Sequence, residues 1–556
     1  MNNPAKTILE LTGKQVLDFL MDHKQFCSFE LPEYFSFQEV LNYVRNTIGE
    51  KSFDECLASN KRPEQFSDTC LNILCNKDGK YGIRPLTLPN PYIYYFLARE
   101  ISANNNWKRI TNCFNRFQVP HFSCGSIPVI PEEKEIFNKS TVILNWWNKM
   151  EQRSLELSLE YRYMFVTDIT NCYGSINPQT IDWALTMKDT QHKTNANHNL
   201  AKNIMSLLKD MQEGRNIGIP QGGTIFDLIA EIILGYADIL LYDKLEKKGI
   251  TEYEILRYRD DYRVFCDDRG MLEEISYTLQ EVLESLNFRM NDKKTMVSQN
   301  PITDCIKSDK LWYIKNTPIF NKKGCDFDGF QKHLLYILMF GREFPNCGQL
   351  KNLLNDLEKR LLERLKPRPK KKKNYKVLFT LGESVDLGLD TEKTNEADTD
   401  TATYQPKLKE SIRPMVAVAT QIAVENMNIT HYALKIISRL VDTLGKDQLQ
   451  ERWDIVNKVR DRLIGRPNSR YDQLWLQNIT YKEDLKTYDD DIKNGTYPYD
   501  LPLCRLAMEE DVQLWNNSWL KPKLTSDIPY STVCDRQLLA NVAPIITFRE
   551  TREYFG

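Results

Sequence analysis

The sequence has no long apolar run and no paired metal-ligand spacing. No window approaches the length of a membrane-spanning helix, and residues 1–7 lack the apolar core of a signal peptide. The 13 cysteines include no CxxC pair, and the six histidines show no HExxH spacing. These absences argue against a zinc site and a disulfide framework, and they indicate free thiols in a reducing compartment. We therefore expect a cytoplasmic protein with no membrane partner.

A strong charge of one sign is also lacking. The formal net charge is -2 over 556 residues, so any positive surface that could attract nucleic acid must be local. With 41% hydrophobic and 27% charged residues, the composition is that of a soluble globular protein. The length exceeds what one hydrophobic core supports and predicts about two to four domains.

Two stretches place aspartates at the ends of predicted strands. In 163–176 an apolar strand runs into Asp168, and a polar turn follows. In 254–266 two apolar runs flank Asp260 and Asp261, which is typical of a hairpin with acids at its tip. Taken alone, such aspartates are equally typical of a solvated turn or a helix cap.

A glycine turn lies between the two acidic stretches. It spans 216–224, contains Pro220-Gln221-Gly222-Gly223, and precedes a long apolar helix predicted over 225–241. Backbone amides at such a turn can approach a nucleotide closely, and a helix N-terminus favours anions. The order of the three stretches is more specific than any one of them.

This order resembles the palm of reverse transcriptases. Motif A falls at Asp168, motif B at 220–222, and motif C at Tyr258-Arg259-Asp260-Asp261. The resemblance is specific over roughly 161–297. It implies an α+β right-hand polymerase fold, with fingers, a palm built on an antiparallel ferredoxin-like sheet, and a thumb, here followed by an α-helical C-terminal domain.

The resemblance implies a metal-dependent nucleotidyl transfer. Asp168, Asp260 and Asp261 would be the catalytic residues and, with the backbone carbonyl of Ile169, would hold two Mg²⁺ ions, or Mn²⁺ in their place. Hard cations prefer such oxygen ligands, and two of them can steady both the attacking and the leaving oxygen of an in-line displacement.

The resemblance also assigns residues to the incoming nucleotide. Tyr173, the aromatic residue after Asp168, would pack where a ribose 2'-hydroxyl would sit, which implies deoxynucleotides. Arg84 and Lys80 would bind the triphosphate, and Lys294 in motif D would act as a general acid near the leaving pyrophosphate. A solvated surface remains the alternative for both lysines. The full set is Lys80, Arg84, Tyr173, Gln221, Gly222 and Lys294.

Motif C departs from the usual pattern because its second residue, Arg259, is normally small or apolar. Arg257 and Arg259 would share one face of the hairpin, where Arg259 could bind a phosphate or pair with an acid. Together with the short Lys-Asp-Gly and Arg-Pro segment in 77–85 and the C-terminal extension, this resembles bacterial defence-associated and abortive-infection reverse transcriptases, the AbiK-like and "unknown group" enzymes.

The rest of the chain gives a domain map. We expect Trp146 and Trp147 in the core, a loop over 117–131 and mixed strand and turn over 316–335. Leucines at helical spacing predict a helix over 349–365, and further helices are predicted over 415–423 and 432–444. The expected units are an N-terminal extension with fingers (1–160), the palm (161–300), a thumb-like region (301–366), a basic then acidic linker (367–408) and a helical, HEAT-like domain (409–556).

Three functions are compatible with these features. We expect an RNA-directed or template-independent DNA polymerase of an antiphage defence system, which uses dNTPs and an RNA template or non-coding RNA to make DNA. A homo-oligomer and a partner defence protein are both left open. One alternative is a nucleic-acid-binding scaffold for a partner reverse transcriptase. The other is a mobile-element enzyme of the group II intron or retron type, which the absence of an HNH-like Cys/His cluster disfavours.

Overall fold

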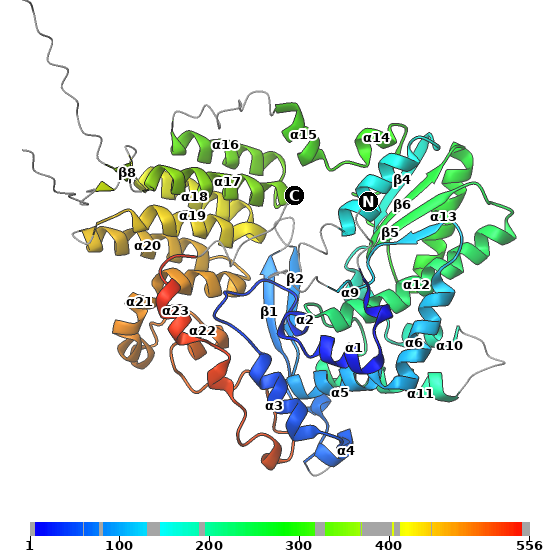
Figure 1. Cartoon of the computed structure of the whole chain (residues 1–556), viewed down its shortest axis with the longest axis horizontal. Helices are drawn as coiled ribbons and strands as arrows, with labels where there is room; N and C mark the ends of the chain where they lie inside the picture. Colours follow the sequence, from blue (N-terminus) through cyan, green and yellow to red (C-terminus); the bar gives the residue numbers. More distant parts are fainter. Residues whose placement is uncertain are drawn as a thin grey trace, which may run out of the picture.

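The computed structural model describes most of the chain. The described residues are 6–58, 61–76, 82–130, 145–187, 195–316, 329–366, 368–369, 403–404, 408, 412–445 and 448–546. Lys80 and nearly all of the predicted linker 367–408 lie outside them. The fold is mixed α/β with a helical majority. Figure 1 shows the largest sheet and its helices at one side of the molecule, stacked helices at the other, and a two-stranded hairpin between them.

The central sheet has five strands in the order β3-β5-β6-β4-β7. Its strands are β3 (Phe122–Cys124), β4 (Tyr163–Asp168), β5 (Glu254–Tyr258), β6 (Asp261–Cys266) and β7 (Met296–Ser298). All neighbouring pairs are antiparallel except β3 with β5, which is parallel. Helix α12 (Thr224–Lys247) packs on α13 (Arg269–Ser285), and α13 packs on β4 and β6.

Strand β3 corrects two sequence predictions. The prediction of a loop over 117–131 is wrong at 122–124, and the sheet is not wholly antiparallel. Three residues are too few to display a period of two, so the strand had no readable sequence signal. Its existence depends on backbone pairing with β5, a partner more than a hundred residues away in the chain.

A second, two-stranded sheet consists of β1 (Leu71–Asn76) and β2 (Ile83–Leu88). Helix α5 (Pro91–Ser102) follows it, with Asn90 as N-cap accepting from the Tyr92 amide at 3.0 Å and Pro91 at the first helical position. Helix α6 (Asn104–Phe117) begins after a break at Ala103.

The stacked helices form one body, which we call the helical body. It comprises α16 (Phe330–Glu343), α17 (Gly348–Leu365), α18 (Ile412–Glu425), α19 (Thr430–Asp442), α20 (Leu449–Ile464) and α21 (Arg470–Asn494). Helix α16 packs against α18, and α17 packs against α19. The helices predicted over 349–365, 415–423 and 432–444 are confirmed. The prediction of strand and turn over 316–335 is wrong from Phe330, where apolar side chains recur at helical spacing inside α16.

The chain beyond α21 returns to the N-terminal part. Isolated β-bridges join Phe35 to Cys534 and Leu57 to Leu520. The indole N–H of Trp515 donates to the Leu88 carbonyl at 3.1 Å. One hydrophobic cluster runs through the N-terminal helices, the central sheet and the helical body. Residues 412–546 are therefore packed into the same core as the sheet.

The remaining elements are short helices, connecting helices and two short strands, β8 and β9. Within the described ranges, none of the helices has the length and apolar composition needed to cross a bilayer. These elements are η1 (Ile8–Glu10), α1 (Gly13–Leu20), α2 (His23–Phe26), α3 (Gln38–Ile48), α4 (Phe53–Cys56), η2 (Pro63–Gln65), η3 (Trp147–Gln152), α8 (Arg153–Leu157), α9 (Cys172–Ser175), α10 (Gln179–Thr186), α11 (Asn195–Met211), α14 (Pro301–Asp304), α15 (Ser308–Asn316), η5 (Met427–Ile429), α22 (Pro502–Ala507), η7 (Pro522–Leu524), η8 (Tyr530–Thr532), α23 (Arg536–Val542), β8 (Arg368–Pro369) and β9 (Thr403–Tyr404).

Candidate active site

Three carboxylates meet at one end of the central sheet. Asp168 is the last residue of β4 and is the register partner of Asp261, the first residue of β6. Asp260 lies in the two-residue turn between β5 and β6, and its carbonyl accepts from the Ile169 amide at 3.0 Å. The sequence prediction that these residues lie together is therefore confirmed by the strand register.

The turn that carries Asp260 is held in an uncommon conformation. Its first residue, Arg259, has φ +54°, a region that residues other than glycine rarely adopt. The Arg259 amide donates to the Ser126 hydroxyl at 2.8 Å, and that hydroxyl donates to Glu231 at 2.6 Å. Surrounding contacts thus fix the backbone of the turn, as is common where strain is kept at functional sites.

Buried charges support the hairpin from below. Arg257 donates to Glu231 at 2.9 Å and to Asp238 at 2.8 Å, and all three side chains are less than 5% exposed. Both acids lie on α12, so this ion network attaches β5 to the helix that follows the glycine turn. Arg257 and Arg259 both face α12, which confirms the predicted shared face.

Asp168 is nearly buried and contacts a lysine. It is 6% exposed, Lys294 Nζ lies 2.5 Å from its Oδ2, and its Oδ1 has no hydrogen-bond partner among the described residues. Desolvation lowers the pKa of Lys294, but the hydrogen bond and charge of Asp168, with Asp261 and Asp260, outweigh it, so the net pKa is raised. Lys294 is therefore a firmly protonated group at this site.

Asp261 has a strongly shifted pKa. Desolvation, followed by the charges of Asp260 and Asp168, raises its pKa to about 6, while Lys294 and Lys307 oppose the shift. The residue is exposed toward solvent, so a cation approaching from that side would relieve the repulsion.

The donor set fits a hard divalent cation. Within the part of the chain that the structure describes, no three His, Cys, Asp or Glu side chains are gathered closely enough to form a ready metal site, although Asp168, Asp260 and Asp261 lie at one end of the sheet. Two observations nevertheless fit a bound cation: the buried Oδ1 of Asp168 has no hydrogen-bond partner among the described residues, and the pKa of Asp261 is raised. A divalent cation bound by these carboxylates would pair with that oxygen and would favour the charged form of Asp261.

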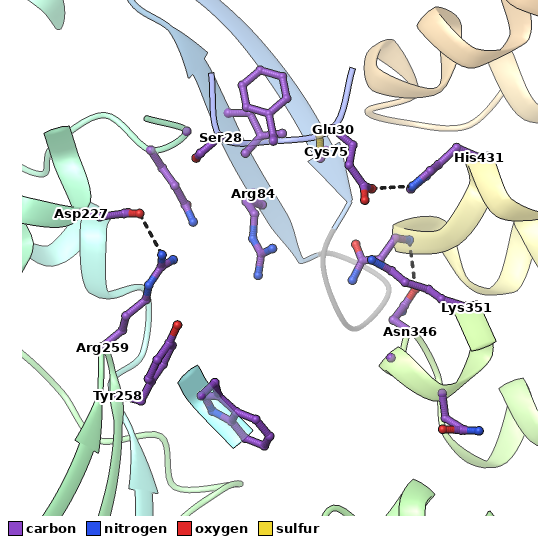
Figure 2. A pocket seen from close by; sticks show the side chains of 18 of the residues that line it. Ser28, Glu30, Cys75, Arg84, Asp227, Tyr258, Arg259, Asn346, Lys351 and His431 are labelled. Atoms are coloured by element: carbon purple, nitrogen blue, oxygen red, sulfur yellow. Dashed lines mark hydrogen bonds and ion pairs between the residues drawn. The ribbon is translucent and has the colours of Figure 1, made fainter. Parts of the chain in front are cut away.

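A cavity of about 1480 Å³ adjoins the carboxylates. Its wall includes Arg84, Gln221, Gly222, Tyr258 and Arg259, together with residues of the helical body. Figure 2 shows Arg84 reaching into it from β2. The three aspartates are not among its lining residues, so the cavity ends at the residues that immediately precede Asp260 and does not enclose it.

The glycine turn is bound on both sides. The Gln221 carbonyl accepts from the Thr87 amide at 2.7 Å, and the Gly222 carbonyl accepts from the Ser28 amide at 2.9 Å. Gly222 has φ +127°, and a Cβ there would lie 3.0 Å from the Phe29 ring. Only glycine fits this position.

Arg259 pairs with an acid that the sequence reasoning missed. Its Nη2 lies 2.8 Å from Oδ2 of Asp227, and Oδ1 of Asp227 accepts from the Tyr173 hydroxyl at 2.5 Å. Of the two roles left open for Arg259, the ion pair is the one observed. An acid in the first turn of the helix after the glycine turn was a readable signal, since a carboxylate is favoured at a helix N-terminus.

The two tryptophans predicted to lie in the core, Trp146 and Trp147, lie at the cavity wall. Trp147 is 37% exposed and donates to Glu151 at 3.1 Å, and Lys307 lies over the Trp146 ring at 4.7 Å. Both residues line the cavity, so the core prediction is wrong for the exposed Trp147, whereas the half-buried Trp146 also packs against a small hydrophobic cluster that includes Met150 and Phe265. They lie where the chain enters η3, and the apolar residues that favoured a core position precede them at 141–144, outside the described residues.

Comparison with known proteins identifies one domain. Residues 107–331 match the family described as "Reverse transcriptase (RNA-dependent DNA polymerase)". Among proteins of curated function, none has a significantly similar sequence.

Solved structures give a weaker likeness. Apo telomerase from Candida tropicalis, truncated from its C-terminal domain, has a TM-score of 0.29 at 13% identity over 47% of this chain and 54% of its own. Telomerase from Candida albicans, in complex with a TWJ fragment of telomeric RNA, gives 0.28 at 11% identity over 73% and 66%. Apo telomerase from Candida tropicalis gives 0.29 at 10% over 81% and 71%. The chain spans about half the length of the first of these, and such scores carry over no function.

Proposed function

Because the chain carries the domain of a reverse transcriptase, an RNA-directed DNA polymerase, over residues 107–331, we propose that the whole protein polymerises dNTPs in an antiphage defence system. The observation that carries the proposal is the register pairing of Asp168 with Asp261 beside Asp260, inside that domain. The template is RNA or a non-coding RNA, or synthesis proceeds without a template, and the product is DNA.

The subdivision follows the right-hand plan. The β1–β2 hairpin serves as the fingers, the central sheet as the palm, and α16 with α17 as the thumb, continued by the rest of the helical body. The cavity wall supports this subdivision, because it draws residues from the hairpin, from Tyr258 of the central sheet, from α17 and from α19 and α21 of the helical body.

The chemistry rests on oxygen ligands. Asp168, Asp260 and Asp261, with the carbonyl of Ile169, would hold two divalent cations, Mg²⁺ or Mn²⁺, which activate the attacking oxygen and neutralise charge on the leaving one. Lys294 leaves Asp168 when the nucleotide binds and donates its proton to the leaving pyrophosphate. In the free site the pKa of Lys294 is raised, so this role requires that the loss of its contact with Asp168 lower that pKa before the proton is donated.

Other residues bind and orient the nucleotide. Arg84 offers two parallel hydrogen bonds to the triphosphate from the cavity wall. Gln221 and Gly222 present the glycine turn to sugar and base, and the ring of Tyr173 excludes a 2'-hydroxyl.

The assignment to the AbiK-like, defence-associated group has a narrower basis. It rests on Arg259 in motif C and on the helical extension that shares a core with the reverse transcriptase domain. A phage challenge tests it: cells expressing the parent should resist infection, and cells expressing Asp260→Ala with Asp261→Ala should not. Equal sensitivity of both would contradict the defence role alone.

The polymerase itself is tested by incorporation of each labelled deoxynucleotide by purified protein with Mg²⁺. Reactions with and without RNA template and primer are run on a denaturing gel before and after protease. Label that depends on added RNA supports conventional reverse transcription, and label without RNA that shifts with protease supports protein-linked synthesis. Incorporation retained by the double variant, at an unchanged melting temperature, would refute the site. No label from the parent under any condition would favour the scaffold alternative.

A further inference from the structure

Three segments of the candidate active site converge on one carboxylate. Tyr173 lies on α9, immediately after β4; Asp227 lies in the first turn of α12; Arg259 lies in the turn between β5 and β6. One oxygen of Asp227 accepts from the tyrosine hydroxyl at 2.5 Å, and the other lies 2.8 Å from the guanidinium. Figure 2 shows the ion pair between Asp227 and Arg259 at the cavity wall.

The two ends of this chain of contacts are themselves fixed. The Tyr173 carbonyl accepts from the Ile219 amide at 2.9 Å, so its backbone is attached to the loop ahead of the glycine turn. Arg259 is attached through its amide to Ser126 at 2.8 Å. The side chains therefore meet between anchored backbones, and little freedom remains for the tyrosine ring.

Protonation states agree with this geometry. Burial, followed by the charge of Asp227, raises the pKa of Tyr173, so its hydroxyl is a donor at neutral pH. The guanidinium of Arg259 is cationic at any working pH. The carboxylate of Asp227 accepts from two strong donors, Tyr173 and Arg259. Its side chain is only 13% exposed, so little water competes with them.

Asp227 and Arg259 line the cavity, and the half-buried Tyr173 lies behind them. If either link is lost, the phenol loses Asp227 as its acceptor, or Asp227 loses the restraint that Arg259 gives it. A ring with two side-chain torsions could then turn away from the sugar. We call the contacts of Asp227 with Tyr173 and Arg259 the tether. By holding the ring in place, the tether would make the exclusion of a 2'-hydroxyl strict.

We propose that Asp227 and Arg259 are positioning residues that hold the Tyr173 ring against the sugar of the incoming nucleotide and so set the preference for deoxynucleotides over ribonucleotides. The inference rests on the proposed function, since it needs a bound nucleotide. It gives the unusual arginine of motif C a role in substrate selection.

The test compares three variants that preserve shape. Tyr173→Phe removes the hydroxyl, Asp227→Asn removes the charge, and Arg259→Met removes the cation. For each, kcat/KM is measured for one dNTP and the matching NTP. We expect the ratio of the two to fall about tenfold or more, mainly because use of the NTP improves. Tyr173→Phe combined with Arg259→Met should fall no further than either alone, because both act through one contact.

Lys359→Met is the matched control. Lys359 also lines the cavity and pairs with Asp356 at 3.4 Å, but it lies on α17, away from Tyr173. It should leave the dNTP to NTP ratio unchanged whatever it does to overall rate. Melting temperatures of all variants identify any that merely fail to fold, and Asp227→Glu should recover part of the ratio by restoring the carboxylate.

A binding measurement distinguishes a failure of the positioning role of Asp227 and Arg259 from a failure of the proposed polymerase function. The Kd values for Mg²⁺-dATP and Mg²⁺-ATP, measured without primer, should differ for the parent and converge in the variants. A parent that incorporates dNTPs while the variants keep its ratio overturns the tether alone. Equal loss of both nucleotides in Arg259→Met would assign that residue to phosphate binding, which also overturns it. A parent that neither binds nor incorporates nucleotides overturns the proposed function as well.

Discussion

Asp484 shows how one buried acid makes stability depend on pH. It lies on α21, is 8% exposed, and accepts from the Thr480 hydroxyl at 2.6 Å. Burial raises its pKa to about 7. The unfolded chain releases this proton near pH 4, so the group destabilises the fold progressively as pH rises from about 4 to about 7, and fully above that.

Asp484→Asn should therefore stabilise the protein at pH 8. An amide keeps the acceptor for Thr480 and has no charge to desolvate, so we expect a gain on the order of 1–4 kcal/mol in unfolding free energy. The gain should shrink toward zero near pH 4. Urea unfolding at several pH values measures it. Asp490→Asn, at an 84% exposed side chain on the same helix, is the control and should change little; a gain independent of pH would contradict the argument.

Sequence reasoning succeeded for residues whose position follows from local pattern. Asp168, Asp260 and Asp261 stand at strand ends, and strand ends can be read from apolar runs. The contacts of Asp227 with Tyr173 and Arg259 were not predicted, because these partners come from two other elements. The contact of Lys294 with Asp168 was missed for the same reason, since the fold alone brings these residues together.

The β5–β6 hairpin depends as an element on its attachment to α12. Arg257 is the shared ion-pair partner of Glu231 and Asp238 in a buried environment. Burial raises the pKa of Asp238 to about 6, and the charge of Arg257 only partly opposes this effect. Removing the cation leaves two buried acids without it, and such losses typically cost about 3–5 kcal/mol.

We therefore predict that Arg257→Met lowers the free energy of unfolding by about 3–5 kcal/mol. The triple variant Arg257→Met, Glu231→Gln, Asp238→Asn should recover much of this loss, because no unpaired charge remains in it. Chemical denaturation of the two variants and the parent measures both effects. If the triple variant is as unstable as the single one, packing of the arginine stem, and not charge, holds the hairpin.

At this same scale the helices were easier to predict than the strands. Helix α17 shows leucines at helical spacing over its whole length, so local pattern sufficed. Strand β3, with three residues, shows no such pattern. The short strand exists through long-range pairing, which a single sequence does not display.

Across the whole molecule, residues 25–30 form a strap between the glycine turn and the helical body. The Ser28 amide donates to Gly222, Glu30 lies 2.7 Å from His431 of α19, and the Tyr471 hydroxyl of α21 donates to the Glu30 carbonyl at 2.8 Å. Figure 2 shows Glu30 and His431 in contact with each other at the cavity wall. The helical body is thus attached through residues 25–30 to the glycine turn.

Glu30→Ala should loosen both ends of this strap. Loss of about 1–2 kcal/mol would speed amide hydrogen exchange roughly 5- to 30-fold in 25–30 and, through the Ser28 contact, in 221–224. Mass spectrometry of exchanged peptides measures it. The exposed Glu50→Ala is the control. Faster exchange confined to 25–30 would show that the strap does not reach the glycine turn.

The return of the C-terminal segment to the N-terminal part makes the chain one folding unit. Asn90 donates to Asn517 at 2.8 Å, Tyr92 donates to the Leu524 carbonyl at 2.5 Å, and both residues are fully buried. Without residues 495–556 these groups and the apolar surface beside them would face water, and buried polar groups left without partners cost about 1–3 kcal/mol each.

A chain ending at Asn494 should therefore be insoluble or should lose the cooperative thermal transition of the parent. A matched deletion within 383–400, the acidic segment that composition predicts to be a linker, should keep both solubility and transition. Soluble yield and calorimetry compare the two. A soluble protein ending at Asn494 with the melting temperature of the parent would mean that the reverse transcriptase domain and helical body fold without the returning segment, and that its bridges are added after the core is complete.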